Sequence, residues 1–452
     1  MYFTGTLYWI THVMVVYGGL QTWVAVPVHA ALVAYLALFP ALFAVVMRRL
    51  LVARGARALL AAPVVWVATE LGRTHVFGGF PWALLGYSQV TMLPVAQLAS
   101  LFGVYGVSAL VASVSAAAAT LVATTSVRER VRAVGPVAAA VVLVAVWGSL
   151  RVGRAEWTRA GVALRVGLVQ GNVDQAEKWQ PARSAAIFQE YLRMTRQAIG
   201  QGAQLVLWPE SSTPFYFEED RADADMVRMI ARQARVPILL GSNQIEWRAR
   251  DNKGIADKYY NSAFLVGADG STAGVYRKMH LVPFGEYVPL RRVLFFAAPL
   301  VEAVGSGFEA GDKAELLPID GHLISTAICY EIVYPELVRR FVSGGSELLT
   351  TITNDAWFGS TSAPYQHFEQ ASMRAIEEGR YLVRSANTGI SGIVDPYGRI
   401  VAESEIFQPA VIVGAVRMIK ESTVYARTGD VFAYLSVVAT IAMLVLSRRR
   451  SR

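Results

Sequence analysis

The chain has 452 residues, of which 54% are hydrophobic and 17% are charged, whereas about 25% of the residues in an average soluble protein are charged. The formal net charge is +8, but the arginine excess lies in residues 1–154 and in the tail after Ser447, and the segment between them is acidic overall. This distribution argues against a nucleic-acid-binding surface on the soluble part of the chain. It is typical of arginines that flank membrane spans.

Six apolar segments approach the length of about 20 residues that a helix needs to cross a membrane. They are residues 6–26, 28–47, 57–71, 95–124, 134–150 and 430–447. Arginine-rich segments lie at 48–57, 128–132 and 448–450. If all three are cytoplasmic, as the positive-inside rule suggests, the large domain between the fifth and sixth spans is outside.

We therefore predict three parts: transmembrane helices in residues 1–153 (about five spans), a soluble domain at 154–428, and a transmembrane helix with a basic cytoplasmic tail at 429–452. The N-terminus lacks a basic region before its apolar sequence, so no cleavable signal peptide is expected. Residues 73–94 are rich in aromatic side chains, and we expect them to form an outside loop at the lipid–water interface.

Strand-like and helix-like patterns alternate in the soluble domain. Strands are predicted at 163–169, 204–208, 237–241, 260–266, 274–278, 323–328, 347–353, 392–395 and 399–402. Helices are predicted at 183–199, 222–234, 335–342 and 366–378. The pattern indicates an α/β or α+β layered domain with mixed sheets.

Three residues that could carry acyl-transfer chemistry each follow a strand-like run: Glu210, Lys278 and Cys329, the only cysteine of the chain. A carboxylate, an ammonium group and a thiol supply a base, an oxyanion partner and a nucleophile. Because Cys329 precedes a predicted helix that begins with a proline, and a lysine is among its expected neighbours, we expect the pKa of its thiol to be lowered. A single cysteine excludes an intramolecular disulfide.

The sequences around these residues resemble the Glu-Lys-Cys signature of the nitrilase superfamily and, more closely, its membrane branch, the apolipoprotein N-acyltransferases. The three matching stretches are Trp208-Pro209-Glu210, Lys278 with the following His-Leu-Val-Pro-Phe-Gly-Glu, and Cys329-Tyr330-Glu331. Further matches include Lys178-Trp179, Tyr260-Asn261-Ser262, and Asn354 through Gly359. The resemblance implies a membrane α-helical bundle plus an α/β domain, a nitrilase-like αββα sandwich on the outer face of the membrane.

The same resemblance implies an acyltransferase of lipoprotein maturation. Cys329 would accept the sn-1 acyl chain of a phospholipid as a thioester, with Glu210 as base and Lys278 as oxyanion partner. The acceptor would be the N-terminal amino group of diacylglyceryl-cysteine on an apolipoprotein. No metal or organic cofactor is implied. The family lies in the bacterial inner membrane, multi-pass, with the catalytic domain facing the periplasm.

Five further residues match positions near the family's site: Glu286, Glu331, Tyr330, Trp179 and Asn261. We expect the two glutamates to hold Lys278 charged and the other three to line the substrate pocket, although a structural role for each is an equal alternative. We also hypothesise that the apolar stretch at 291–301 is a lid that dips into the bilayer.

Family members carry about two more spans before the segment that resembles residues 2–9, so this chain has six predicted spans where the family implies eight. Two other functions fit the sequence. One is a membrane-tethered amidase of the nitrilase type that hydrolyses a small amide. The other is a catalytically inactive scaffold that binds lipid or lipoprotein.

Overall fold

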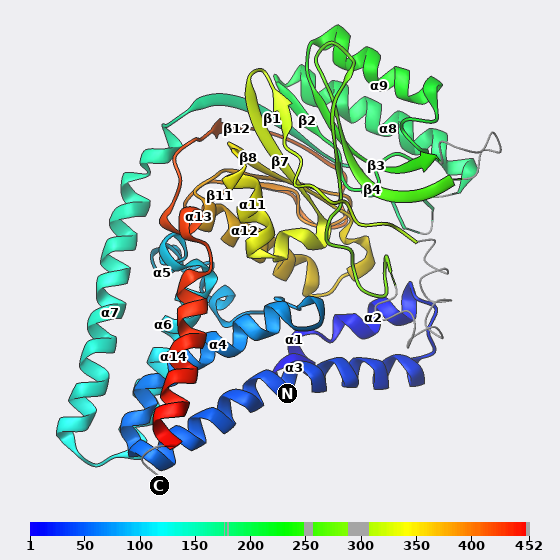
Figure 1. The fold of residues 1–452 in the computed structure, drawn as a ribbon. Helices are drawn as coiled ribbons and strands as arrows, with labels where there is room; N and C mark the ends of the chain where they lie inside the picture. Colours follow the sequence, from blue (N-terminus) through cyan, green and yellow to red (C-terminus); the bar gives the residue numbers. More distant parts are fainter. Residues whose placement is uncertain (176, 179, 248–255, 288–306, 449–452) are drawn as a thin grey trace.

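Figure 1 shows a group of long helices with an α/β domain at one end. In this computed structural model the described residues are 1–175, 177–178, 180–247, 256–287 and 307–448. Trp179 and the stretch at 291–301 lie outside the described residues. The predicted combination of apolar helices with an α/β domain of two sheets is confirmed.

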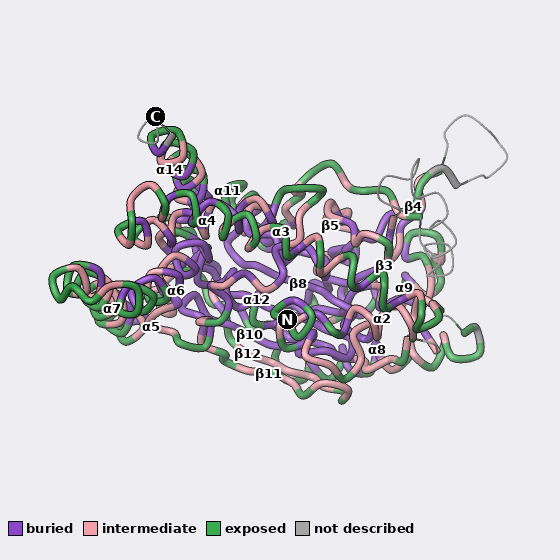
Figure 2. Tube along the Cα trace, turned by 90° about the horizontal axis from the view of Figure 1, so that it is seen from below, coloured by how far each residue is buried: buried purple, intermediate pink, exposed green. Residues whose placement is uncertain are grey.

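The long apolar helices come from the N-terminal third of the chain and from its C-terminal end. They are α3 (Thr22–Arg54), α4 (Ala62–His75), α6 (Ala99–Ala123), α7 (Val127–Arg154) and α14 (Val431–Arg448). Within the described residues, the stretches Thr22–Gly78, Ala99–Ala123 and Val127–Thr158 are long and apolar enough to cross a membrane, and Val431–Ser447 is apolar but shorter. Figure 2 shows that α7 is largely exposed, which is expected of a helix that faces lipid.

The predicted span at 6–26 is not one helix. The chain instead forms α1 (Tyr2–Thr6) and α2 (Trp9–Val16) and then turns through Gly19, which has a φ of +63 that suits glycine. The Trp9 ring lies 5.0 Å from the Trp82 ring, and the Tyr17 hydroxyl donates a hydrogen bond to the Ala356 carbonyl at 2.7 Å. The segment therefore lies against the α/β domain, and four long helices stand where about five spans were expected.

The arginine-rich segments at 48–57 and 128–132 lie at the end of the helices that is remote from the α/β domain (Figure 1). The end of α3, the 3-10 helix η1 (Gly55–Ala61) and the start of α7 meet there, and the Arg57 guanidinium is 3.9 Å from the Glu129 carboxylate. The C-terminal end of α14 reaches the same end of the molecule.

The α/β domain contains two six-stranded sheets in the orders β12-β1-β2-β3-β4-β5 and β11-β10-β9-β8-β7-β6. The strands of the first sheet are β1 (Val162–Gln170), β2 (Leu205–Leu207), β3 (Ile238–Trp247), β4 (Ala256–Val266), β5 (Thr272–Arg277) and β12 (Ala410–Met418). Those of the second are β6 (Leu317–Ile319), β7 (His322–Ile328), β8 (Leu348–Thr353), β9 (Leu382–Ala386), β10 (Gly392–Val394) and β11 (Ile400–Glu403). Both sheets mix parallel and antiparallel pairs.

Helices cover the outer faces of the two sheets, giving the αββα layering. Helices α8 (Pro181–Gly200) and α9 (Arg221–Ala234) lie on the first sheet, and α11 (Pro335–Ser343) and α12 (Ala363–Glu378) lie on the second (Figure 1). Side chains of both inner faces, such as Leu207 and Ile352, belong to one buried cluster. The short helices α5 (Leu93–Ala96) and α13 (Val424–Thr428) lie near the junction with the long helices.

Buried polar groups join α12 to α6. Helix α6 is interrupted at Gly103, whose φ is +66 and whose Cβ position lies 2.5 Å from the Tyr425 ring, so a larger residue would not fit. The interruption leaves the Val104 N–H free to donate to the Glu377 carboxylate of α12 at 2.7 Å. Arg374 of the same helix donates to the Tyr87 hydroxyl at 2.7 Å. These bonds fix the α/β domain on the long helices.

Part of the aromatic segment 73–94 is buried at the junction between the long helices and the α/β domain, whereas Phe77 is 86% exposed. Trp82 is only 1% exposed. The Arg73 guanidinium donates hydrogen bonds to the carbonyls of Trp82 at 2.7 Å and Ala83 at 3.2 Å. The Glu70 carboxylate accepts from the Leu85 N–H at 2.7 Å. The two buried charged side chains of α4 thus hold this segment beneath the α/β domain.

We predict that Arg73→Met lowers the free energy of unfolding by about 3 to 5 kcal/mol, because it leaves the Glu70 carboxylate buried without its cation and the carbonyls of Trp82 and Ala83 without donors. Thermal unfolding in detergent micelles measures the change. Arg57→Met is the matched control, since the Arg57 side chain is 76% exposed and its pair with Glu129 is a surface pair, which contributes little. Equal melting temperatures for the two variants would contradict the structural role of Arg73.

Candidate active site

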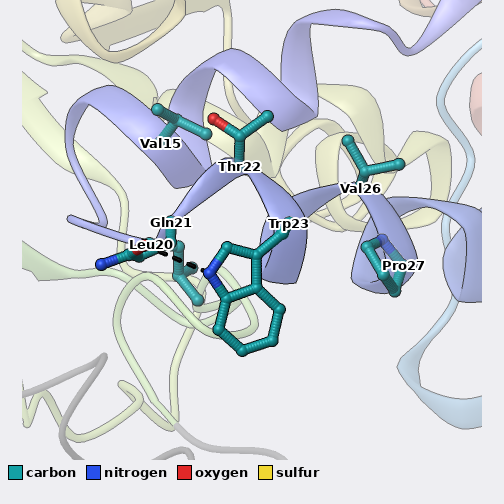
Figure 3. Close-up of a pocket in the computed structure, with 7 residues that line it drawn as sticks. All are labelled: Val15, Leu20, Gln21, Thr22, Trp23, Val26 and Pro27. Carbon is teal, nitrogen blue, oxygen red and sulfur yellow. Dashed lines mark hydrogen bonds between the residues drawn. The ribbon is translucent and has the colours of Figure 1, made fainter.

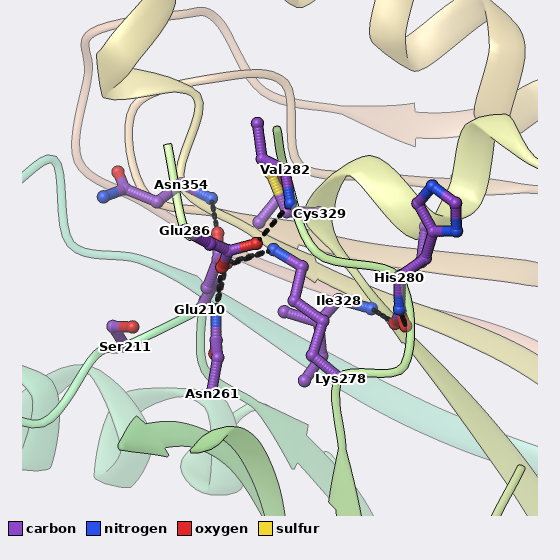
Figure 4. A network of polar contacts seen from close by, with 12 residues as sticks. Glu210, Ser211, Asn261, Lys278, His280, Val282, Glu286, Ile328, Cys329 and Asn354 are labelled. Carbon is purple, nitrogen blue, oxygen red and sulfur yellow. Dashed lines mark hydrogen bonds and ion pairs between the residues drawn. The ribbon is translucent and has the colours of Figure 1, made fainter. Parts of the chain in front are cut away.

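Glu210, Lys278 and Cys329 meet at one edge of the two sheets. Each follows the end of a strand: Glu210 comes shortly after β2, Lys278 directly after β5, and Cys329 directly after β7. Since β2 and β5 run in the same direction in one sheet, their carboxyl ends share an edge. All three side chains are buried, with exposed fractions of 6%, 1% and 7%. Figure 4 shows the Lys278 amine directed at the carboxylates of Glu210 and Glu286, with Cys329 beside them.

A single ammonium group is shared between two carboxylates. Lys278 Nζ lies 2.9 Å from Glu286 Oε1 and 3.3 Å from Glu210 Oε1. The Asn261 amide donates to the same two oxygens, at 3.0 Å and 2.7 Å. Backbone N–H groups of Asn354 and Val282 donate to the outer oxygens of Glu210 and Glu286, at 3.0 Å and 2.7 Å. Both oxygens of each carboxylate therefore accept hydrogen bonds.

This pairing keeps both charges in place inside the protein. Burial disfavours the Lys278 ammonium, but Glu286 and Glu210 outweigh burial and raise the pKa of Lys278 above its usual range. Burial likewise disfavours the Glu210 carboxylate, but Lys278 and the Asn261 amide lower the pKa of Glu210 below that of an ordinary glutamate. Near neutral pH the site holds an ammonium group and an ionised Glu210.

Cys329 is a protonated thiol in this setting. Burial raises the pKa of Cys329 well above its usual range, the Glu210 carboxylate adds to the increase, and Lys278 opposes it only in part. The expected lowering of the Cys329 pKa is therefore wrong, because the expectation rested on a nearby lysine and a helix start and did not include the burial of the thiol. An attack by this thiol would require the loss of its proton, and Glu210 is the ionised carboxylate beside it.

Glu331 fixes the turn that carries Cys329 against the loop that carries Lys278. Its carboxylate accepts hydrogen bonds from the N–H groups of Ile328 at 2.7 Å, Met279 at 2.7 Å and His280 at 3.0 Å, and from the Tyr276 hydroxyl at 2.8 Å. Burial raises the pKa of Glu331 to about 7, although these donors favour its ionised form. Glu286 contacts the Lys278 ammonium, as expected for a residue that holds it charged. Glu331 instead accepts hydrogen bonds from the backbone N–H groups next to Cys329 and next to Lys278.

Tyr330 forms a wall of the site together with residues of the membrane part. Its ring stacks on the Trp82 ring at 6.3 Å and lies 6.5 Å from the Phe80 ring. Its hydroxyl accepts a hydrogen bond from the Tyr334 hydroxyl at 3.2 Å. The segment that α4 holds in place therefore reaches the residue next to Cys329.

Lys178 is a neighbour of the site that was matched in the sequence but not selected as a site residue. It is buried, and its amine lies 3.4 Å from the Glu210 carbonyl oxygen. Burial lowers the pKa of Lys178 to about 8, although the Glu210 charge opposes the change. Its position directly before Trp179 in a matched stretch was the signal that could have indicated it.

The sequence analysis also missed three buried residues near the main chain of Cys329, which are Asp355, His367 and Arg384.

Among the residues that the structure describes, no group of three or more His, Cys, Asp or Glu side chains is arranged to hold a metal ion. An open, mainly apolar pocket of about 820 Å³ lies at the turn between α2 and α3, where Trp23 and Pro27 line it (Figure 3). Its lining residues all come from that turn and the two helices, and none belongs to the cluster around Lys278.

Comparison with known proteins gives the class of this site. Residues 165–422, more than half of the chain, match the carbon-nitrogen hydrolase family. An amidase from Nesterenkonia sp. of known structure aligns over 60% of this chain and 94% of its own length, at 21% identity and a TM-score of 0.43. This likeness concerns the fold alone.

The N-terminal residues identify the particular family. Residues 1–117 match the apolipoprotein N-acyltransferase N-terminal domain. The apolipoprotein N-acyltransferase of Geobacter metallireducens is 40% identical over 99% of this chain and 85% of its own, and that of Methylococcus capsulatus is 38% identical over 98% and 84%. The chain belongs to the apolipoprotein N-acyltransferase family, and its apolar helices make it a membrane protein.

We predict that iodoacetamide alkylates Cys329 slowly at about pH 7 and that the rate still rises above about pH 9, because a thiol with a raised pKa holds little thiolate at neutral pH. As the only cysteine, Cys329 gives an unambiguous signal by mass spectrometry. The unfolded chain is the control, since its thiol should titrate near the ordinary value of about 8.5. A rate that is already constant below about pH 8 in the folded protein would mean that the pKa is not raised.

Proposed function

We propose that the protein transfers the sn-1 acyl chain of a phospholipid, through a thioester on Cys329, to the N-terminal amino group of diacylglyceryl-cysteine on an apolipoprotein. Membership of the family supports the acceptor and the type of reaction. The observation that carries the proposal is the position of the buried Glu210, Lys278 and Cys329 beside a wall built by the membrane part.

The composition of that wall favours a lipid substrate. Trp82 and Phe80 come from the segment after α4, and Trp9 from α2 packs on Trp82 at 5.0 Å. A soluble amidase of the same fold class has no need of side chains from apolar helices next to its nucleophile. A phospholipid whose acyl chains remain in the membrane can present its ester carbonyl at this junction.

The first step forms the thioester. Glu210 takes the proton of the Cys329 thiol as the sulfur attacks the ester carbonyl carbon, and the carbonyl electron pair moves to oxygen. The Lys278 ammonium and backbone N–H groups near Cys329 stabilise that oxyanion. The carbon–oxygen bond to glycerol then breaks, and the glycerol oxygen takes the proton from Glu210. Lysophospholipid leaves, and the acyl chain remains on sulfur.

The second step uses the same groups. The α-amino group of the acceptor has an ordinary pKa of about 7.7–8.0, so it is largely protonated near neutral pH and must lose a proton before attack. Its nitrogen attacks the thioester carbonyl while Glu210 accepts a proton from it. The carbon–sulfur bond breaks, the amide remains, and Cys329 regains its proton from Glu210. No metal or organic cofactor takes part in this scheme.

We also infer the placement in the cell. Residues 1–153 and 429–452 would contain the membrane-spanning helices, and residues 154–428 would form the catalytic domain. The arginine-rich segments at the remote end of the helices support a cytoplasmic position for that end. The catalytic domain then faces the periplasm across the bacterial inner membrane, where apolipoproteins carry their lipid-modified N-termini.

A transfer assay with phospholipid vesicles and a diacylglyceryl-peptide tests the proposal. With donors labelled in either acyl chain, we expect label from sn-1 alone in the peptide, and lysophospholipid in equal amount. Cys329→Ala should abolish transfer, and Glu210→Gln should slow it by about 100-fold or more because it removes the base. Glu190→Gln, at an exposed pair with Arg193, is the control that should retain the parent rate.

Each other function gives a different result in this assay. Free labelled fatty acid without labelled peptide would show hydrolysis in place of transfer, and release of ammonia from a small amide supplied instead of phospholipid would show the amidase. Lipid binding without any product would show a scaffold. Label from the sn-2 chain in the peptide would contradict the assignment of the donor position.

A further inference from the structure

Three buried side chains, His367, Asp355 and Arg384, form a cluster that contacts the main chain of Cys329. His367, from α12, is completely buried, and its Nε2 lies 3.1 Å from the Cys329 carbonyl oxygen. The other ring nitrogen, Nδ1, lies 3.0 Å from the Asp355 carboxylate and 3.1 Å from the Arg384 guanidinium. Arg384 and Asp355 are themselves paired at 2.7 Å. None of the three touches Lys278 or Glu210 through a described hydrogen bond.

Chemistry fixes the direction of the bond to Cys329. A carbonyl oxygen can only accept, so Nε2 must carry a proton and donate it. In the neutral ring Nδ1 is then an acceptor: Arg384 donates to it, and the Asp355 carboxylate, which cannot donate, is paired with the same guanidinium. Burial and, after it, the Arg384 charge lower the pKa of His367, so the ring stays neutral near neutral pH. The cluster therefore favours the tautomer of His367 that carries its proton on Nε2, and this N–H points at the Cys329 carbonyl oxygen.

The backbone that receives this bond is unusual. Cys329 has a φ of +53, a conformation that a residue with a side chain adopts at a free-energy cost and keeps only when its surroundings impose it. A trans peptide is planar, so its C=O and N–H groups point in opposite directions. Because His367 holds the Cys329 carbonyl, the N–H of Tyr330 in the same peptide unit points away from His367.

We propose that His367 is a positioning residue for acyl transfer: it fixes the Cys329–Tyr330 peptide plane so that the Tyr330 N–H is aimed at the oxyanion formed on attack by Cys329. The Arg384 guanidinium, which is paired with Asp355, donates to Nδ1 and so supports this tautomer and the orientation of the His367 ring. The inference rests on the proposed function for the identity of the acyl donor, but its geometry applies to any carbonyl substrate that Cys329 attacks.

Trp82 links this cluster to the membrane part. Its ring lies 5.4 Å from the His367 ring and stacks on the Tyr330 ring, so it packs on the side chain that holds the Cys329 carbonyl and on the side chain of the next residue. The Trp82 carbonyl is in turn held by Arg73 of α4. The peptide plane next to the nucleophile is thus supported from α12 and from the segment after α4.

Two reactions of the same sulfur separate an oxyanion effect from general disorder. Attack on a p-nitrophenyl ester passes through an oxyanion and gives a burst of p-nitrophenolate, whereas alkylation by iodoacetamide displaces iodide and forms no oxyanion. We expect His367→Leu to slow the ester burst by about 10- to 100-fold, somewhat less than the loss of a whole oxyanion donor, and to leave the alkylation rate within about twofold. His367→Gln, whose amide N–H can replace Nε2–H, should restore most of the burst rate.

His322→Leu is the matched control, because His322 begins the same strand that ends before Cys329 and pairs with Glu347 at 2.6 Å. It should leave both reactions at the parent rate. Equal loss of burst and alkylation in His367→Leu, an unchanged burst, or the absence of rescue by His367→Gln would each overturn the inference. A normal burst in the parent protein without acylation by phospholipid vesicles would refute the proposed donor alone.

Discussion

The site depends on one buried ammonium group shared between two carboxylates. Lys278 lies between Glu286 and Glu210, and the Asn261 amide donates to both carboxylates. Removal of one partner from such a group leaves an uncompensated charge in a medium that solvates it poorly. The same group sets the chemistry: Lys278 keeps Glu210 ionised, and the ionised Glu210 helps to keep Cys329 protonated until a substrate arrives. The resting site is therefore a thiol beside a base rather than a preformed thiolate.

The second constraint is the junction between the α/β domain and the apolar helices. The α/β domain matches the carbon-nitrogen hydrolase family, and Trp82 of the membrane part stacks on Tyr330 next to Cys329. Trp82 is held there by Arg73, and α12 is bound to α6 through Glu377. A change in the long helices can therefore reach the site through a short path of packed and hydrogen-bonded groups.

Much of this arrangement could be predicted from the sequence, because most strands and helices of the α/β domain show clear periodicity and Glu210, Lys278 and Cys329 lie in distinctive motifs. Strands β6, β9 and β12 were missed: β6 has only three residues, and β9 contains the buried Arg384. The predictions of a lowered Cys329 pKa and of a membrane span at 6–26 were wrong for a common reason. Both depend on burial, and burial depends on which distant elements cover a residue. His367 was missed for the same reason, because its partners Asp355 and Arg384 are distant in the sequence.

The most direct test of the account is the intact mass of the protein after incubation with phospholipid vesicles and no acceptor. The account predicts one acyl adduct that hydroxylamine removes, that maps to Cys329, and that disappears when a diacylglyceryl-peptide is added, as the peptide gains the same chain. Cys329→Ala should show no adduct. An adduct on another residue, an adduct that passes to water but not to the peptide amine, or no adduct in a folded protein would contradict the account.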